Sequence, residues 1–152
     1  MHWYTTIQGM AANNLSSYHK TLANQSHAMR FVVATVLILV ALMHALPVMG
    51  VLGATKLSQL YAITVQDPNL ELLLRHRAVL FGLLAAFLAY AAVRPALHRL
   101  ALIAGFISVM TFLALAQPAG ALNTALTTVV RADWLALVLL VMGAIVHFKR
   151  SA

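Results

Sequence analysis

The ionisable side chains that could form a binding site lie near the ends of long apolar runs. Arg75 and Asp133 each precede such a run, and Glu71 comes one helical turn before Arg75. Arg75 shares a helix face with the small residues Gly82, Ala86 and Ala89. Asp133 likewise shares a face with Ala136, Leu140 and Ala144. Small residues let helices approach closely, so we predict an ion pair between Arg75 and Asp133, with Glu71 as the competing partner. Arg77 and Arg131 are turned about 200° from these two residues, and we expect them to face lipid headgroups.

His44 is the polar residue that would complete a pocket. It flanks the small residues of the first apolar run, which are Ala34, Ala41 and Ala45. With Arg75, Asp133 and Glu71 it would form a buried polar cluster that opens to the outer side of a membrane. The surplus positive charge of this cluster would suit an anionic lipid headgroup or a small anion. The alternative is that the charges only hold two helices together, since an unpaired charge at the bilayer centre costs roughly 2.5–3.5 kcal/mol.

Four histidines form a second group that could do chemistry. By topology His44 and His76 belong to the outer half of a bundle, and His98 and His147 belong to its inner end. Facing histidines in a four-helix bundle can be axial haem ligands, so two such pairs would make an electron-transfer subunit carrying haem b. Interfacial anchoring is the other interpretation, because His98 adjoins Arg99 and His147 lies two residues before Lys149.

Sequence motifs of common enzyme classes are absent. The chain has no G-x-S-x-G, no Walker loop, no H-E-x-x-H and no clustered carboxylates, and it has no cysteine to supply a thiolate nucleophile or metal ligand. We therefore predict no catalytic residue and no metal site other than the haem alternative. The sequence favours a non-enzymatic protein, structural or accessory to a larger complex.

The elements that position these residues follow from the composition. Of 152 residues, 62% are hydrophobic and 9% are charged, whereas soluble domains carry about 25% charged residues. This excludes an ordinary soluble domain, and it excludes a nucleic-acid-binding module despite the net charge of +7. The chain is therefore predicted to be a small integral membrane protein in contact with the lipid bilayer.

Four apolar segments are long enough to cross a membrane, at about 31–49, 72–93, 100–116 and 129–148. The first has nineteen residues, which gives about 28 Å against a hydrocarbon core of ~30 Å. Residues 50–66 form a connector with a short amphipathic helix in the interface, an irregular loop being the alternative. We predict an all-α bundle of four transmembrane helices over residues 30–150. Residues 1–29 are expected to be a disordered polar extension, or to precede the true start at Met29.

The positive charges predict the orientation. The side that holds both termini has six Lys or Arg residues and no acid, whereas the other side has four together with all three acids. The positive-inside rule then places both termini in the cytoplasm and the chain in a bacterial inner membrane. Small residues on the spans permit self-association or a membrane-protein partner.

Four segments carry a resemblance to a known family. They read HALPVMGVLG at 44–53, DPNL at 67–70, LRHRAVLFG at 74–82 and VRAD at 130–133. Over roughly two-thirds of its length the chain resembles a family of small bacterial four-span membrane proteins, and more weakly the DoxX-like membrane proteins. Some members of the first family are labelled phosphopantetheine adenylyltransferase, a soluble α/β enzyme that holds ATP with a Gly-His motif. This chain has no Gly-His dipeptide, so the resemblance implies the four-span architecture and no activity.

Overall fold

The computed structural model describes residues 28–151, with side chains described as far as Lys149. All its secondary structure is helical. The first helix covers residues 28–45 and continues as the 3-10 helix η1 (Leu46–Leu52). The remaining elements, in order, are α2 (Ala54–Tyr61), α3 (Pro68–Ala92), η2 (Pro95–Leu97), α4 (His98–Ala116), η3 (Gln117–Ala119) and α5 (Thr124–Ser151). The predicted all-α fold, with a short helix between the first two spans, is confirmed. The extension predicted before Met29 lies almost wholly outside the described residues.

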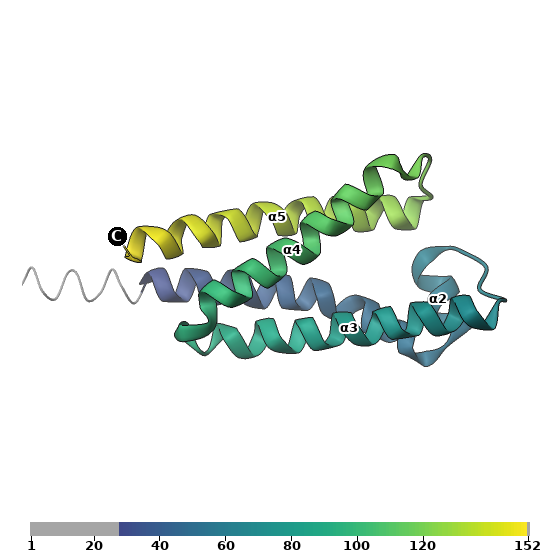
Figure 1. The fold of residues 1–152 in the computed structure, drawn as a ribbon, viewed down its shortest axis with the longest axis horizontal. Coiled ribbons are helices and arrows are strands. Elements are labelled where there is room, and N and C mark those ends of the chain that lie inside the picture. Colours follow the sequence, from purple (N-terminus) through teal and green to yellow (C-terminus); the bar gives the residue numbers. More distant parts are fainter. Residues whose placement is uncertain (1–27, 152) are drawn as a thin grey trace, which may run out of the picture.

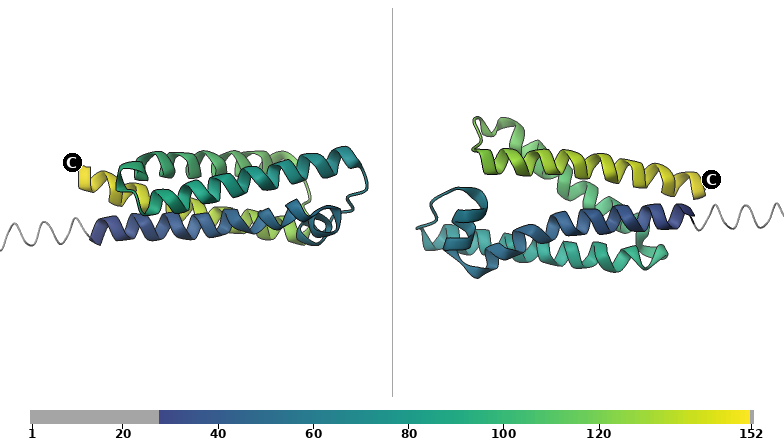
Figure 2. Two further views of the ribbon diagram at one scale, coloured as in Figure 1. Left: turned by 90° about the horizontal axis from the view of Figure 1, so that it is seen from below. Right: turned by 180° about the vertical axis from the view of Figure 1, so that it is seen from behind.

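Four helical segments are long and apolar enough to cross a membrane. They are Ala28–Leu52, Pro68–Ala92, Pro95–Ala119 and Thr124–Lys149. The helices run along one another as an elongated bundle, and α4 crosses it obliquely (Figure 1). The described start of the chain and the end of α5 lie at one end of the bundle, and α2 lies at the opposite end in every view (Figure 2). We call this opposite end the α2 end.

Polar caps explain why α3 and α5 begin earlier than their apolar runs. Asp67 accepts a hydrogen bond from the backbone N–H of Asn69 at 2.8 Å, and Pro68 follows at the first helical position. Asn123 caps α5 in the same way, because its side-chain oxygen accepts from the N–H of Leu126 at 2.9 Å. The two helices begin at Pro68 and Thr124, before the apolar segments at about 72–93 and 129–148. Both spans gain about one turn or more at the α2 end.

Close packing places α2 against η1. Gly50 is buried, and a Cβ atom at this position would lie only 2.7 Å from Cδ2 of Leu57. Leu57 is fully buried and packs with Tyr61 and Val65. The missing side chain at Gly50 thus lets α2 lie directly on η1, which brings Tyr61 over the α2 end of α3.

The core of the bundle is apolar, and so is much of its outer surface. Leu37, Leu88 and Leu140 are fully buried at the contact of three long helices. Large side chains such as Leu42, Leu83 and Val138 are instead exposed along the spans. Exposed apolar side chains on spanning helices are covered by lipid. The chain is accordingly a multi-pass membrane protein.

Candidate functional site

A cavity of about 170 Å³ lies inside the bundle toward the α2 end. Bulk water occupies about 30 Å³ per molecule, so the cavity has room for a small polar group. Its polar lining comes from three spans and α2, and its apolar lining includes two phenylalanine rings. The lining residues that matter below are His44, Tyr61, Arg77, Phe81, Phe112, Thr128 and Asp133.

The ionisable groups of this cavity lie some turns inside their helices. His44 lies eight residues before the end of the first span at Leu52, and Arg77 lies nine residues after Pro68. Asp133 lies nine residues after Thr124. Three separate spans therefore bring a histidine, an arginine and an aspartate to one cavity.

Aromatic rings hold the Arg77 guanidinium. Its central carbon lies 5.5 Å from the ring centre of Tyr61, 5.0 Å from that of Phe81 and 5.7 Å from that of Phe112. These rings belong to α2, α3 and α4, and each attracts the cation through its negative face. Within residues 28–149 the guanidinium makes no hydrogen bond and no ion pair within 4 Å. The group is fixed in position while its N–H donors stay available.

Arg77 therefore lies in the bundle interior rather than at the lipid headgroups where the sequence analysis placed it. The reason is the helix face. At 100° per residue, Leu84 and Leu88 lie within about 20° of Arg77, and Leu88 is fully buried. Arg131, in contrast, is exposed. Its contact with lipid headgroups stays a prediction.

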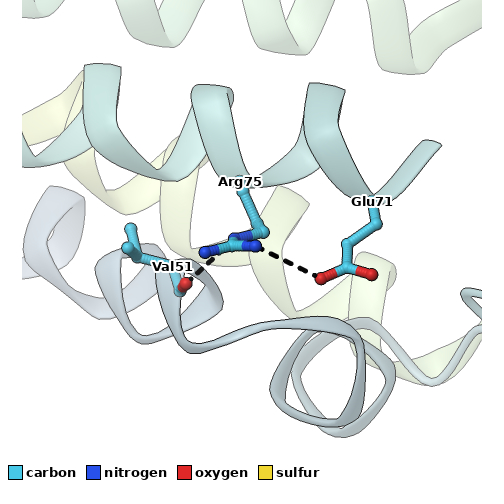
Figure 3. Close-up of polar contacts among 3 residues, drawn as sticks. All are labelled: Val51, Glu71 and Arg75. Carbon is cyan, nitrogen blue, oxygen red and sulfur yellow. Dashed lines mark hydrogen bonds and ion pairs between the residues drawn. The ribbon is translucent and has the colours of Figure 1, made fainter. Parts of the chain in front are cut away.

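Arg75 points away from the cavity. Its Nε donates to the backbone oxygen of Val51 at 3.1 Å, and one terminal nitrogen lies 3.5 Å from Glu71 Oε1 (Figure 3). The Arg75 side chain is 49% exposed and the Glu71 side chain 30%. The competing partner named in the sequence analysis is thus the actual partner, and the predicted ion pair with Asp133 is not formed. Arg75 instead attaches α3 to the end of η1.

The small residues chosen as a marker explain this difference. Gly82, Ala86 and Ala89 share the Arg75 face, but they line a separate apolar groove between the first helix and α3. The core residues of α3 are Leu88, Ala91 and Ala92, so small residues lie on more than one side of this helix. The position of small residues therefore does not identify the side of α3 that faces the cavity.

Asp133 is partly buried in the cavity wall. It lines the cavity together with His44 and Arg77. Its carboxylate accepts no hydrogen bond, and forms no ion pair within 4 Å, among residues 28–149. Asp133 and Arg77 thus share one cavity without a direct contact between their charged groups.

His44 lines the cavity with a fixed ring. It is 5% exposed, its Nδ1 donates to the Val40 carbonyl at 2.9 Å, and its Nε2 lies 3.2 Å from Ser108 Oγ. In the neutral tautomer this arrangement makes Nε2 the acceptor of the Ser108 hydroxyl proton. The ring also packs against Phe81, with centroids 5.6 Å apart. Of the four residues predicted to cluster, His44 and Asp133 share the cavity, whereas Arg75 and Glu71 lie outside it.

The histidines proposed as haem ligands are placed differently at the two ends. His44 is buried with both ring nitrogens hydrogen-bonded, whereas His76 is exposed. His98 and His147 do come together, with ring centroids 6.4 Å apart in an edge-on arrangement. No group of three or more metal-ligating side chains occurs in the part of the chain that the structure describes. Haem ligation stays a prediction that depends on the inner pair.

Sequence reasoning missed Arg77, its three rings and Ser108 as parts of the site. A signal for Arg77 was present, because Phe81 follows it by one turn and Leu84 and Leu88 continue the same face. No local pattern connects Tyr61 or Phe112 to Arg77, because they lie on other helices.

Comparisons with protein-family models, with curated proteins and with solved structures find no match to this chain. The chemistry of the cavity is therefore the basis for a functional argument.

Proposed function

We propose that this protein is a non-enzymatic binding protein of a bacterial inner membrane, and that its cavity takes up the acidic group of a ligand through Arg77. The charge distribution supports an orientation with both termini in the cytoplasm, which puts the α2 end at the outer face. The family resemblance, to small four-span bacterial proteins, supports the same location.

The observation that carries this proposal is the state of the Arg77 guanidinium. It is partly buried in a membrane-spanning bundle, held by three rings and without a hydrogen-bond acceptor among residues 28–149. A guanidinium has five N–H donors in a planar fork, and those of Arg77 have no acceptor among residues 28–149. A ligand that supplies acceptor oxygens would engage these donors.

A phosphate or carboxylate is the ligand group that fits such a donor. Both accept two parallel hydrogen bonds from arginine, and charge-assisted bonds of this kind are about twice as strong as neutral ones. Lipids of the outer leaflet and small anions outside the cell both provide such groups. The ring contacts leave the guanidinium oriented before the ligand arrives, which lowers the entropy lost on binding.

Lipid retention by the purified full chain tests this function. Native mass spectrometry in the presence of phosphatidylglycerol measures the bound fraction for the wild type and for Arg77→Gln. Loss of a charge-assisted pair worth about 1.5–3 kcal/mol weakens binding about tenfold or more, so we expect little retained lipid in the variant.

Arg131→Gln is the matched control. Arg131 is also an arginine within a span, but it is exposed and does not line the cavity. It should retain lipid as the wild type does. Equal retention by Arg77→Gln and the wild type would show that the cavity charges serve only to hold the spans together.

A further inference from the structure

We infer that the ligand of this cavity carries an ammonium group as well as an acidic group, in the arrangement of ethanolamine phosphate. Arg77 would bind the phosphate and Asp133 the ammonium. This inference rests on the proposed function and specifies its ligand class. Two charged groups that line one cavity from different helices, both without a hydrogen bond or ion pair among residues 28–149, are the juxtaposition from which it follows.

The charge balance of the cavity favours such a ligand over a simple anion. Arg77 and Asp133 are residues of opposite charge that line one cavity, and they lie farther apart than the 4 Å of an ion pair. An anion bound to Arg77 would bring a second negative charge toward the Asp133 carboxylate, which is unfavourable in a site of low dielectric constant. A ligand with both charges satisfies the two groups together.

The hydrogen-bonding requirements point the same way. The guanidinium only donates hydrogen bonds, and an ionised carboxylate only accepts them. A single ligand must therefore offer acceptors to Arg77 and donors to Asp133. Phosphate oxygens and an ammonium group, separated by two methylene groups, provide both within a few ångströms.

The walls around this pair have room for the linker. Phe81 and Phe112 contribute apolar surface to the same cavity, which suits the two methylene groups. His44 is already fixed by Val40 and Ser108, so it contributes a wall more than a free donor. A glycerol headgroup would instead place hydroxyl groups, without positive charge, against Asp133.

An apolar groove leads from Arg77 toward the α2 end. It has a volume of about 360 Å³ and shares Arg77 and Phe112 with the cavity, and its other lining residues are Leu115, Ala116, Ala119, Leu122 and Leu126. Ethanolamine phosphate has two sources in this location. It is the headgroup of phosphatidylethanolamine in the surrounding bilayer, or a free molecule that enters along the groove.

A competition between two lipids tests the inference. Phosphatidylethanolamine and phosphatidylglycerol with identical acyl chains are added in equal amounts to the purified full chain, and native mass spectrometry measures the ratio retained. We expect the wild type to prefer phosphatidylethanolamine by about tenfold, the ratio that corresponds to 1.4 kcal/mol. Equal retention of the two lipids, or a preference for phosphatidylglycerol, would overturn the inference. This outcome is measured on the wild type, so it does not depend on whether any variant folds.

Asp133→Asn then assigns the preference to its residue. The variant keeps the side-chain shape and removes the charge, so the ratio should fall toward one. Glu71→Gln is the control, because Glu71 is paired with Arg75 outside the cavity. A preference that survives Asp133→Asn unchanged would refute the role of this carboxylate.

The source is decided by adding free ethanolamine phosphate or glycerol phosphate to the lipid-loaded protein. Displacement of the lipid by ethanolamine phosphate alone supports a free ligand, and no displacement by either supports the lipid headgroup. Displacement by glycerol phosphate as readily as by ethanolamine phosphate counts against the inference. The two proposals can fail separately. If Arg77→Gln loses both lipids while Asp133→Asn leaves the lipid ratio unchanged, the proposed function is supported and the further inference is refuted.

Discussion

Arg75 and Arg77 lie two residues apart on α3, and their guanidinium groups are in opposite environments. Arg75 reaches the backbone oxygen of Val51 and the carboxylate of Glu71 at the surface of the bundle (Figure 3). Arg77 lies among three aromatic rings in the interior. Two positions along a helix correspond to a rotation of about 200°, which is enough to place one arginine at the bundle surface and the other in the cavity.

A double-mutant cycle distinguishes the partners of Arg75. We expect Arg75→Ala and Asp133→Ala to change the free energy of unfolding additively, within about 0.5 kcal/mol, because the two side chains make no contact. Arg75→Ala and Glu71→Ala should couple, but by less than about 1 kcal/mol, since the pair is partly exposed. Thermal unfolding in detergent measures the change in stability of the three single variants and of the two double variants that complete the cycles. A strong coupling of Arg75 to Asp133 would contradict the arrangement described above.

Asn123 attaches the start of α5 to the end of α2. Its side-chain Nδ2 donates to the backbone oxygen of Tyr61 at 2.8 Å and lies 3.3 Å from the backbone oxygen of Ala62. Its side-chain oxygen caps α5. Asn123→Asp keeps the cap and loses the donor, so hydrogen exchange should accelerate in α2 and remain slow at the start of α5.

Asn123→Ala is the matched comparison, because it loses both functions. It should accelerate exchange in both segments and lower the free energy of unfolding by a further 0.5–2 kcal/mol or so. Identical exchange patterns in Asn123→Ala and Asn123→Asp would show that the tether to α2 contributes nothing.

Gly50→Val is expected to displace α2. The added methyl groups would overlap Leu57, which is fully buried, and overpacking of this kind costs about 1–3 kcal/mol. Combining Gly50→Val with Leu57→Ala should restore part of the stability, because the smaller residue makes room. Thermal unfolding of the two single variants and the double variant checks this, and purely additive losses would argue against the contact.

The four spans could be predicted from apolar run length, and the short helix between the first two from its amphipathic pattern. The capping residues Asp67 and Asn123 are of types that are typical of helix starts. Run length succeeds because the bilayer core sets the number of consecutive apolar residues that a span requires.

The face of α3 that carries Arg77 could not be predicted in the same way. In a soluble protein the polar side of a helix marks its exposed face, but in a membrane both the lipid side and the protein side are apolar. Small residues were used as the marker instead, and on α3 they lie both in the groove beside the first helix and in the core, where Ala91 and Ala92 are buried with Leu88. The contacts of Arg77 with Tyr61 and Phe112 depend on how three helices meet, which no single helix encodes.

The three rings around Arg77 link the cavity to the relative positions of the helices that carry them. Because Tyr61, Phe81 and Phe112 come from α2, α3 and α4, sliding or tilting any of these helices against the others would remove one ring from the cation and admit solvent. A ligand bound to Arg77 as proposed would favour the arrangement of helices in which the three rings hold the guanidinium. Occupancy of the cavity and the packing angle of α4 would then be thermodynamically coupled, and each would bias the other.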